Sequence, residues 1–363
     1  MKILHTESSC GWGGQEIRIL SEAEGMAARG HEVALVAPRE AQIHGAALKR
    51  GLNVIALPIA RKGIRGVLAL RNWLKEHRPD VLNTHSSTDS WLSAIACTTL
   101  SRPPAIVRTR HISAPVPYDP LTRWLYLKAT RHIVTTGEDL RAQLVRDNGF
   151  PPGRITSIPT GIDPERFVPG ERAGARRITG LPQEIRLIGI VATLRSWKGH
   201  RYLVEAFSRL PSEIGLVIVG DGPQRGNIES QIARLGLGER VWLPGNQEEV
   251  LPWLQSLDVF ALPSYANEGV PQALVQAMLC CLPCVTTLAG SIGEVARDGV
   301  TAVIVRAGDA ADLERGLVAT LADGKLRERL GGAARRHCSE NFGRDKMLDR
   351  MEKVLRDAAD PLK

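Results

Sequence analysis

The chain has 363 residues, of which 43% are hydrophobic and 24% charged, and it carries a formal net charge of +8 at pH 7. This length predicts two domains of roughly 100–200 residues each, and the composition is typical of a soluble globular protein. The first apolar run, Met1 to His5, is too short for the core of a signal peptide, and no apolar stretch approaches the ~20 residues of a membrane-spanning helix. Because the six cysteines also lack a regular spacing, we expect a protein of the reducing cytoplasm.

Apolar strands and amphipathic helices alternate along the chain. A first strand at 2–6 leads through a glycine-rich turn into a helix whose apolar face holds Ile17, Leu20, Ala23 and Met26. Further helices are expected at 67–76 and 89–100, and further strands at 32–37, 81–84, 105–109, 133–136, 186–191, 215–220, 241–243, 259–262, 283–286 and 302–305. Such alternation predicts parallel sheets with right-handed crossovers.

The pattern restarts after a polar, glycine-rich stretch near residues 169–177, so we expect two domains, at 1–168 and 169–341. The last segment, 342–363, holds a charged amphipathic helix with Met347, Met351 and Val354 on one stripe.

Two loops between a strand and a helix carry residues suited to an anionic ligand. Gly13 and Gly14 follow the first strand, where glycine lets the backbone approach a ligand and a helix N-terminus offers unpaired N–H groups. Arg195 and Lys198 follow the first strand of the second domain, and an arginine fork with a lysine charge can clamp a diphosphate. By itself, the first loop is equally typical of a plain turn, and the second fits a solvated turn better.

The most informative segment is the loop and helix at 263–278. Glu268 lies just before a helix that begins near Pro271, and Gln276 lies about two helical turns after Glu268. A carboxylate and an amide in these places can hold sugar hydroxyls, while the helix N-terminus meets phosphate.

Together these segments resemble glycosyltransferase family 4, whose members are retaining enzymes, and the resemblance covers nearly the whole chain. It implies an α/β fold of two Rossmann-like parallel-sheet domains that face a cleft, the GT-B architecture, with the C-terminal helix crossing back to the first domain. It rests on six features in the family's order: a Gly-Gly-x-Glu-like loop at 13–16, His111 after a mid-domain strand, an Ile-Pro-x-Gly-Ile-Asp-like turn at 158–163, the pair Lys198-Gly199, Gly-Asp-Gly-Pro at 220–223, and a Glu-x7-Glu-like signature that starts at Glu268.

The resemblance implies three catalytic residues. Lys198 would bind the donor diphosphate with help from Arg195, Glu268 would contact hydroxyls of the donor sugar, and His111 would lie at the junction of donor and acceptor.

Further donor-binding residues are implied in the same way. The backbone N–H groups of Gly269, Val270 and Gln272 would approach phosphate, and Gly13 and Gly14 would line the opposite side. Gln276 stands where the family has a second glutamate that binds ribose hydroxyls, a task that an amide can also perform.

Metal and cofactor requirements follow from what the sequence lacks. No Asp-x-Asp occurs, so we expect a nucleotide-sugar donor handled without a bound metal and without a cofactor. The resemblance and the absence of an obvious carboxylate nucleophile imply retention of anomeric configuration by front-face substitution.

The first 165 residues hold 21 basic and 15 acidic side chains, so the excess charge lies there. An acidic acceptor, an anionic membrane surface or nucleic acid would each explain this excess. The resemblance favours a glycan or lipid-linked acceptor such as lipopolysaccharide, without nucleic acid. We therefore expect a peripheral protein on the inner face of the plasma membrane, with contacts at 61–65 and at 118–128, where a helix would place Leu121, Trp124 and Leu125 on one stripe.

Three alternatives remain open at this point. A sugar-nucleotide epimerase of the same architecture would need more acid/base carboxylates than Glu268 alone. A binding protein without catalysis is suggested by Gln276 and by Thr193, which stands where the family usually has arginine. The third alternative is a dehydrogenase. Cys281 and Cys284 have redox spacing but read as structural, and His85 fits a structural role as well as a place facing the cleft.

Overall fold

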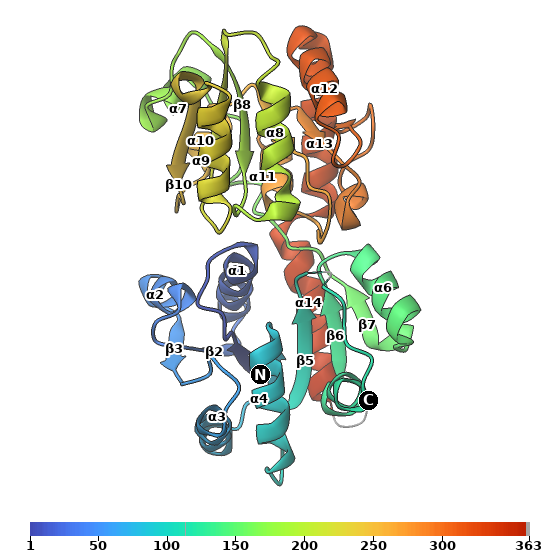
Figure 1. Ribbon diagram of the computed structural model, residues 1–363. Coiled ribbons are helices and arrows are strands. Elements are labelled where there is room, and N and C mark those ends of the chain that lie inside the picture. The colour runs from blue at the N-terminus through green and yellow to red at the C-terminus, as the bar shows by residue number, and fades with distance from the viewer. Residues whose placement is uncertain (113, 361–363) are drawn as a thin grey trace. The chain divides into compact units, whose positions relative to one another are not determined.

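A computed structural model describes residues 1–112 and 114–360. The chain forms two compact units, one of Met1–Gly161 with the segment from Asp345, and one of Ile162–Arg344. Figure 1 shows both units, each with a sheet and its own helices. The sequence placed the divisions after residues 168 and 341, and the contacts place them after Gly161 and Arg344.

The first unit contains a sheet of seven parallel strands in the order β3-β2-β1-β4-β5-β6-β7. The two unpredicted strands, β3 and β7, are the two edge strands of this sheet. The strands are β1 (Lys2–Thr6), β2 (Glu32–Ala37), β3 (Asn53–Ala56), β4 (Val81–Thr84), β5 (Ala105–Arg110), β6 (His132–Thr135) and β7 (Ile155–Ser157).

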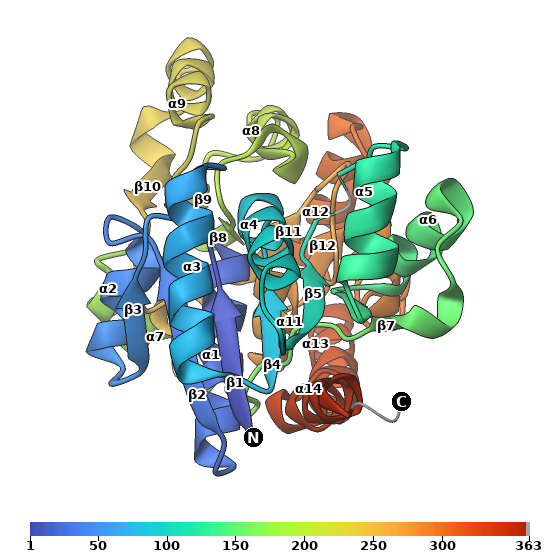
Figure 2. The ribbon, with the colours of Figure 1, turned by 90° about the horizontal axis from the view of Figure 1, so that it is seen from below.

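Helices cover both faces of this sheet. In Figure 2, α3, α4 and α5 lie on one side of the strands and α1 and α14 lie on the other. The elements are α1 (Gly14–Ala28), α2 (Gln42–Lys49), α3 (Ile64–His77), α4 (Ser87–Thr98), α5 (Pro120–Trp124), the π-helical turn η1 (Leu125–Ala129), α6 (Glu138–Asn148), the 3₁₀ turn η2 (Pro152–Arg154) and α14 (Arg344–Ala359).

The buried face of α1 differs from the expected one. Leu20, Ala23 and Met26 are buried as predicted, but Ile17 is only half-buried. Two charged residues, Arg18 and Glu22, are fully buried on this helix. The predicted stripe in α5 and η1 is also incomplete, because Leu125 is buried and only Leu121 is exposed.

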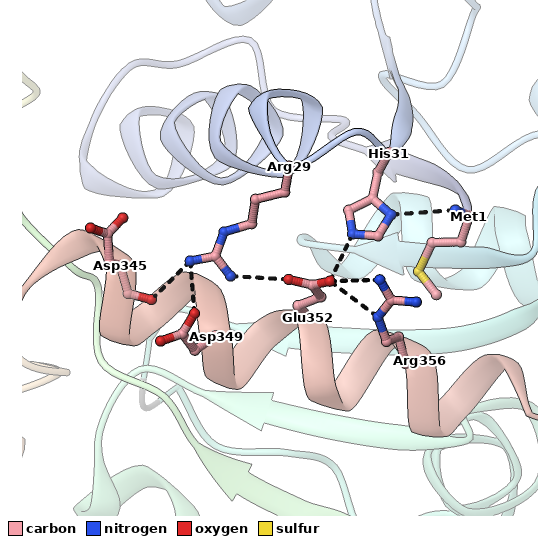
Figure 3. A network of polar contacts seen from close by, with 7 residues as sticks. All are labelled: Met1, Arg29, His31, Asp345, Asp349, Glu352 and Arg356. Atoms are coloured by element: carbon pink, nitrogen blue, oxygen red, sulfur yellow. Dashed lines mark hydrogen bonds and ion pairs between the residues drawn. The ribbon is translucent and has the colours of Figure 1, made fainter.

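Helix α14 packs on the first unit. Its apolar stripe, predicted from Met347, Met351 and Val354, is buried against strand residues that include Ile3 and Val107. Its polar side is tied to the end of α1, as Figure 3 shows. Glu352 accepts a hydrogen bond from Arg29 at 3.0 Å and from Arg356 at 2.7 Å, and its Oε1 lies 3.1 Å from His31 Nε2.

We expect Glu352→Gln to destabilise the first unit by about 1 kcal/mol at pH 7, because the charged acceptor of these bonds is lost. Hydrogen bonds from Arg356 and from Arg29 lower the pKa of Glu352 to about 2. Because the folded-state pKa is lowered, this stabilisation is present above the ordinary pKa of 4.5 and is lost as the pH falls towards 2.

Urea unfolding of both proteins across this pH range measures the difference in unfolding free energy. Asp349→Asn is the control, because Asp349 pairs with Arg29 but its side chain is 71% exposed. A difference between Glu352→Gln and wild type that stays constant with pH would contradict the assignment.

The second unit contains six parallel strands in the order β10-β9-β8-β11-β12-β13, and the parallel sheets predicted for both domains are confirmed. The inner strands β8 and β9 are buried on both faces, as their continuous apolar runs predict. The strands are β8 (Arg186–Val191), β9 (Ile214–Val219), β10 (Val241–Gly245), β11 (Val259–Leu262), β12 (Cys284–Thr286) and β13 (Val303–Ile304).

The helices of this unit are α7 (Arg172–Thr179), α8 (His200–Phe207), α9 (Arg225–Arg234), α10 (Leu251–Gln255), α11 (Gln272–Leu279), α12 (Ala310–Ala322) and α13 (Gly324–Asn341), with 3₁₀ turns η3 (Ser196–Lys198), η4 (Gly238–Arg240) and η5 (Gly290–Glu294). Cys281 and Cys284 are free thiols, and burial raises the pKa of Cys284 well above its usual range. Among the helices described in either unit, none is long and apolar enough to cross a membrane.

Candidate functional site

In the second unit, two loops at the carboxyl edge of the sheet bring Lys198 and Glu268 together. Lys198 ends the turn after β8, and Glu268 lies between β11 and α11. Since β8 and β11 are neighbours in the sheet, the loops that follow them meet. The side chains form an ion pair, with Lys198 Nζ 2.7 Å from Oε1 and 2.9 Å from Oε2 of Glu268. Ligands of open α/β sheets bind at this edge.

The approach of these two loops requires Gly199. This residue has a φ of +78°, and a Cβ there would lie 2.0 Å from the carbonyl oxygen of Pro263. Packing against Pro263 therefore explains Gly199, and the ion pair with Glu268 explains Lys198.

Glu268 is held as a buried carboxylate. It is only 4% exposed, and Ser264 Oγ donates a hydrogen bond to its Oε1 at 2.7 Å. A buried carboxylate needs such partners, which also fix its orientation. The ammonium group of Lys198 has three donors and its side chain is 19% exposed, so it retains donor capacity towards a ligand beyond Glu268.

Gly290 supports Glu268 from the other side. A Cβ on Gly290 would lie 2.1 Å from the Glu268 carbonyl oxygen, and its φ is +56°. We expect Gly290→Ala to displace Glu268 and to lower the activity of the site by about 10²-fold, since a shift of about 1 Å costs that much. Gly293→Ala in the same turn is the control, because its Cβ would meet only a Leu288 side-chain carbon at 3.6 Å. Equal activity of the two variants would refute this support.

The other residues predicted in this unit lie in the same loops and in α11. Arg195 is exposed, and its guanidinium carbon lies 5.7 Å from the centre of the Trp197 ring. The remaining four are buried or half-buried around the start of α11: Gly269, Val270, Gln272 and Gln276. The structure thus joins Lys198 to Glu268 directly and places Arg195 against a ring.

His200 is a neighbour that the sequence reasoning missed. It is the first residue of α8 and is 2% exposed. Burial, and next to it the charge of Lys198, lowers its pKa to about 3. Its position directly after the Lys-Gly pair was the only available signal.

In the first unit, the predicted residues lie after two strands. Gly13 caps the N-terminus of α1 and Gly14 is its first residue. His111 directly follows β5 and is half-buried. His85, for which the sequence allows a structural or a functional role, follows β4 and is bonded to His111, with His85 Nδ1 3.1 Å from His111 Nε2.

Two buried carboxyl groups near His85 were also missed. Asp89 accepts hydrogen bonds from Thr6 Oγ1 at 2.8 Å and from the His85 backbone N–H at 2.9 Å. Glu7 accepts one from the Ser9 backbone N–H at 2.6 Å, and burial, followed by the charge of Asp89, raises the pKa of Glu7 to about 8. Asp89 had a recognisable signal, because Ser86 and Asp89 form a capping box at the start of α4.

A cavity of about 440 Å³ opens above these groups at the carboxyl edge of the first sheet. It lies among the loops after β1, β2, β3 and β4, and it includes the point between β1 and β4 where the order of the strands reverses. Such a switch point is the usual ligand site of an open parallel sheet. Hydroxyl groups dominate its lining, with one acid and one base: Ser8, Ser9, Cys10, Glu40, Ala60, Arg61, Ser86, Ser87 and Thr88.

Comparison with known proteins gives matches over both units. Residues 12–166 match the family described as Glycosyltransferase Family 4, and residues 171–337 match the family described as Glycosyl transferases group 1.

Curated relatives share the name D-inositol 3-phosphate glycosyltransferase. The protein from Xylanimonas cellulosilytica is 28% identical over an alignment of 385 positions, which covers 93% of this chain and 91% of that protein. The one from Geodermatophilus obscurus is 29% identical over 249 residues, and the match spans 65% of this chain and about half, 54%, of that protein.

The fold is also similar to solved structures. The Anabaena protein HepE in complex with UDP-glucose superposes with a TM-score of 0.89 at 20% identity, covering 98% of this chain and 100% of that one.

Proposed function

We propose, on the premise that the chain belongs to glycosyltransferase family 4, that it transfers a sugar from a nucleoside diphosphate to an acceptor hydroxyl. The observation that carries this proposal is the Lys198–Glu268 ion pair at the carboxyl edge of the second sheet. A fixed cation beside a buried carboxylate suits a donor that has a diphosphate at one end and a polyol at the other.

The second unit binds the donor in this proposal. Lys198 and Arg195 neutralise the diphosphate, and the N-terminal backbone of α11, with Gly269, Val270 and Gln272, contributes N–H groups. Glu268 accepts hydrogen bonds from sugar hydroxyls, and Gln276 holds the ribose. HepE, which has a similar fold, has been solved in complex with UDP-glucose, so a uridine nucleotide sugar is the first donor to test.

The first unit binds the acceptor in its hydroxyl-lined cavity. Serine and threonine side chains there exchange hydrogen bonds with a polyol, and Arg61 adds a cation for an acidic group. The relatives are named for D-inositol 3-phosphate, which has several hydroxyl groups and an anionic phosphate. A phosphorylated glycan or a lipid-linked acceptor such as lipopolysaccharide has the same two kinds of group. We therefore propose an acceptor that combines several hydroxyls with an anionic group, and we keep His111 at the junction of donor and acceptor and Gly13 and Gly14 among the donor-binding residues.

The proposed chemistry is front-face transfer with retention and without a metal. The bond between the anomeric carbon and the phosphate oxygen breaks, the acceptor oxygen bonds to that carbon from the same face, and its proton passes to the leaving phosphate. Lys198, Arg195 and the N-terminus of α11 stabilise the charge that develops on the diphosphate.

Incubation with a panel of nucleotide sugars tests the proposal. We expect one donor to raise the unfolding temperature, since a ligand at 100 times its Kd stabilises by about 2.7 kcal/mol. With an acceptor, the product should keep the donor's anomeric configuration, and EDTA should not slow its formation. Conversion of the donor sugar without an acceptor would establish an epimerase instead, and binding without transfer or hydrolysis would establish an inactive binding protein.

We also propose that the first unit binds an anionic membrane surface from the cytoplasmic side. Its contact area, the basic apolar surface, consists of Arg61, Lys62, Ile64, Leu68, Tyr118 and Leu121, all of which are exposed. The segments 61–68 and 118–124 flank Trp91 of α4, because Lys62 Nζ is 5.3 Å from the Trp91 ring and Trp91 stacks on Trp124 at 6.3 Å. Exposed apolar side chains with cations at their edge favour interfacial binding, at about 1 kcal/mol per cation.

Co-sedimentation with vesicles tests this surface. The wild type should bind vesicles rich in anionic lipid at low salt and release them at high salt, and Ile64→Ser/Leu121→Ser should bind less. Ile178→Ser is the control, because Ile178 is 75% exposed but lies in the second unit. Equal binding to neutral vesicles, or none, would mean that the charge serves a soluble acidic acceptor.

A further inference from the structure

Three histidines from three strands form a continuous chain in the first unit. His5 lies in β1, His85 follows β4 and His111 follows β5, and these strands are adjacent in the sheet. His5 Nδ1 is 3.0 Å from His85 Nε2, and His85 Nδ1 is 3.1 Å from His111 Nε2. The rings follow one another at centroid distances of 5.3 Å, so the chain runs from the interior to a half-buried end at His111.

The three imidazoles are neutral, so each carries one ring proton. Burial lowers the pKa of His5 to about 4, and it lowers the pKa values of His85 and His111 well below their usual range. The nearby cations Arg18 and Arg110 act in the same direction. A chain of neutral rings must be polarised one way throughout, because each hydrogen bond needs one donor and one acceptor nitrogen.

The inner end of the chain decides the direction. His5 is fully buried, and its Nε2 has no hydrogen-bond partner among the residues that the structure describes. If His111 donated inwards, the proton of His5 would lie on this Nε2 and a buried N–H would be left without an acceptor. If His5 instead donates towards His85, its Nε2 is an unprotonated nitrogen without a donor. A buried N–H group without an acceptor is rarer in proteins than a buried acceptor without a donor.

We propose that His5 and His85 are positioning residues that hold His111 in the tautomer with its proton on Nδ1. His5 Nδ1–H then donates to His85 Nε2, and His85 Nδ1–H donates to His111 Nε2. The outer edge of His111 thus presents an N–H donor and no basic nitrogen. Resting on the proposed function, His111 acts by hydrogen-bonding a substrate oxygen, and it does not remove the acceptor proton.

The loop that carries His85 is itself fixed. Asp89 accepts the His85 backbone N–H at 2.9 Å, and the same carboxylate oxygen accepts Thr6 Oγ1 from the residue after His5. β1 and β4 are thereby tied together beside the ring contact. The His85 backbone N–H and the Thr6 side chain, both bonded to Asp89, therefore keep the His5 and His85 rings in place.

Nitrogen NMR of the protein with ¹⁵N-labelled histidine, without any substrate, tests the tautomer directly. At neutral pH, His111 should show a protonated Nδ1 and a bare Nε2. His85→Leu should remove the selection, because His111 Nε2 then loses the N–H that donates to it, so that His111 shows both tautomers. His132→Leu is the matched control, because His132 is bonded to Thr156 and lies outside the chain, and it should leave the His111 signals unchanged. A protonated Nε2 on His111 in the wild type would overturn the proposal.

Two substitutions at His111 provide a second readout, in transfer assays. The Asn amide reaches about as far as Nδ1 and the Gln amide about as far as Nε2, so His111→Asn should be about tenfold more active than His111→Gln. If the protein transfers sugar and His111→Gln is the better variant, the tautomer proposal fails alone. If it transfers none, the proposed function fails, and the NMR result still decides the tautomer.

Discussion

We expect Lys198→Ala to lower the kcat of sugar transfer by about 10²–10³-fold while the protein stays folded, as is typical for the loss of one preorganised electrostatic group. The ammonium group is held 2.7 Å from Glu268 in a half-buried setting, so its position is set before the donor binds. Its charge matters most when the diphosphate leaves. Steady-state kinetics with the donor found in the panel measures the effect.

The control separates the role of the lysine from that of its partner. Lys198→Ala leaves the Glu268 carboxylate buried without its cation, which by itself could disturb the loop. Glu268→Gln and the double variant complete a double-mutant cycle. Binding of UDP should weaken in Lys198→Ala and remain close to normal in Glu268→Gln, because we propose that the carboxylate contacts the donor sugar and not the diphosphate. Near-normal kcat in a folded Lys198→Ala protein would refute the assignment.

The second large effect concerns stability. We expect Arg18→Leu to lower the unfolding free energy of the first unit by about 3–5 kcal/mol, because it leaves a buried charge without its partner. Arg18 and Glu22 are both fully buried, with Arg18 Nε 3.6 Å from Glu22 Oε2. Arg18 also donates to the Ile158 carbonyl at 2.6 Å, and Glu22 accepts from Asn83 at 3.1 Å.

Denaturant unfolding measures this change. The double variant Arg18→Leu/Glu22→Leu should recover much of the loss, since replacing both members of a buried pair by apolar residues is often close to neutral. Arg209→Ala is the surface control, because its partner Glu205 is 49% exposed and such pairs contribute less than about 1 kcal/mol. If Arg18→Leu lowered the unfolding free energy no more than Arg209→Ala does, the buried Arg18–Glu22 pair would not be important for stability.

The local sequence pattern was sufficient to predict a strand where the strand is a single short apolar run. The strands at Lys2–Thr6, Glu32–Ala37, Val81–Thr84, Arg186–Val191 and Val259–Leu262 have the predicted bounds, because each is a short apolar run between turn residues. β3 and β7 were not predicted. They are edge strands of four and three residues: the apolar run Val54–Ala56 of β3 was overlooked and is only half-buried, and β7 has one apolar residue, Ile155.

In the site, residue types and their order along the chain identified Lys198 and Glu268, because both follow strand ends in a recognisable pattern. The sequence by itself therefore determined the fold class, most strand positions and the candidate donor-binding residues.

Only the tertiary structure decided which distant residues meet. His5 contacts His85, and Arg18 contacts Ile158, across 80 and 140 residues of chain. The physical reason is the strand order, which makes β1 the neighbour of β4 and leaves the side chains after both strands at one edge. A local sequence pattern shows arginine and histidine side chains only as polar. The packing of β1, β4 and α1 determines that Arg18, His5 and His85 are buried and hydrogen-bonded.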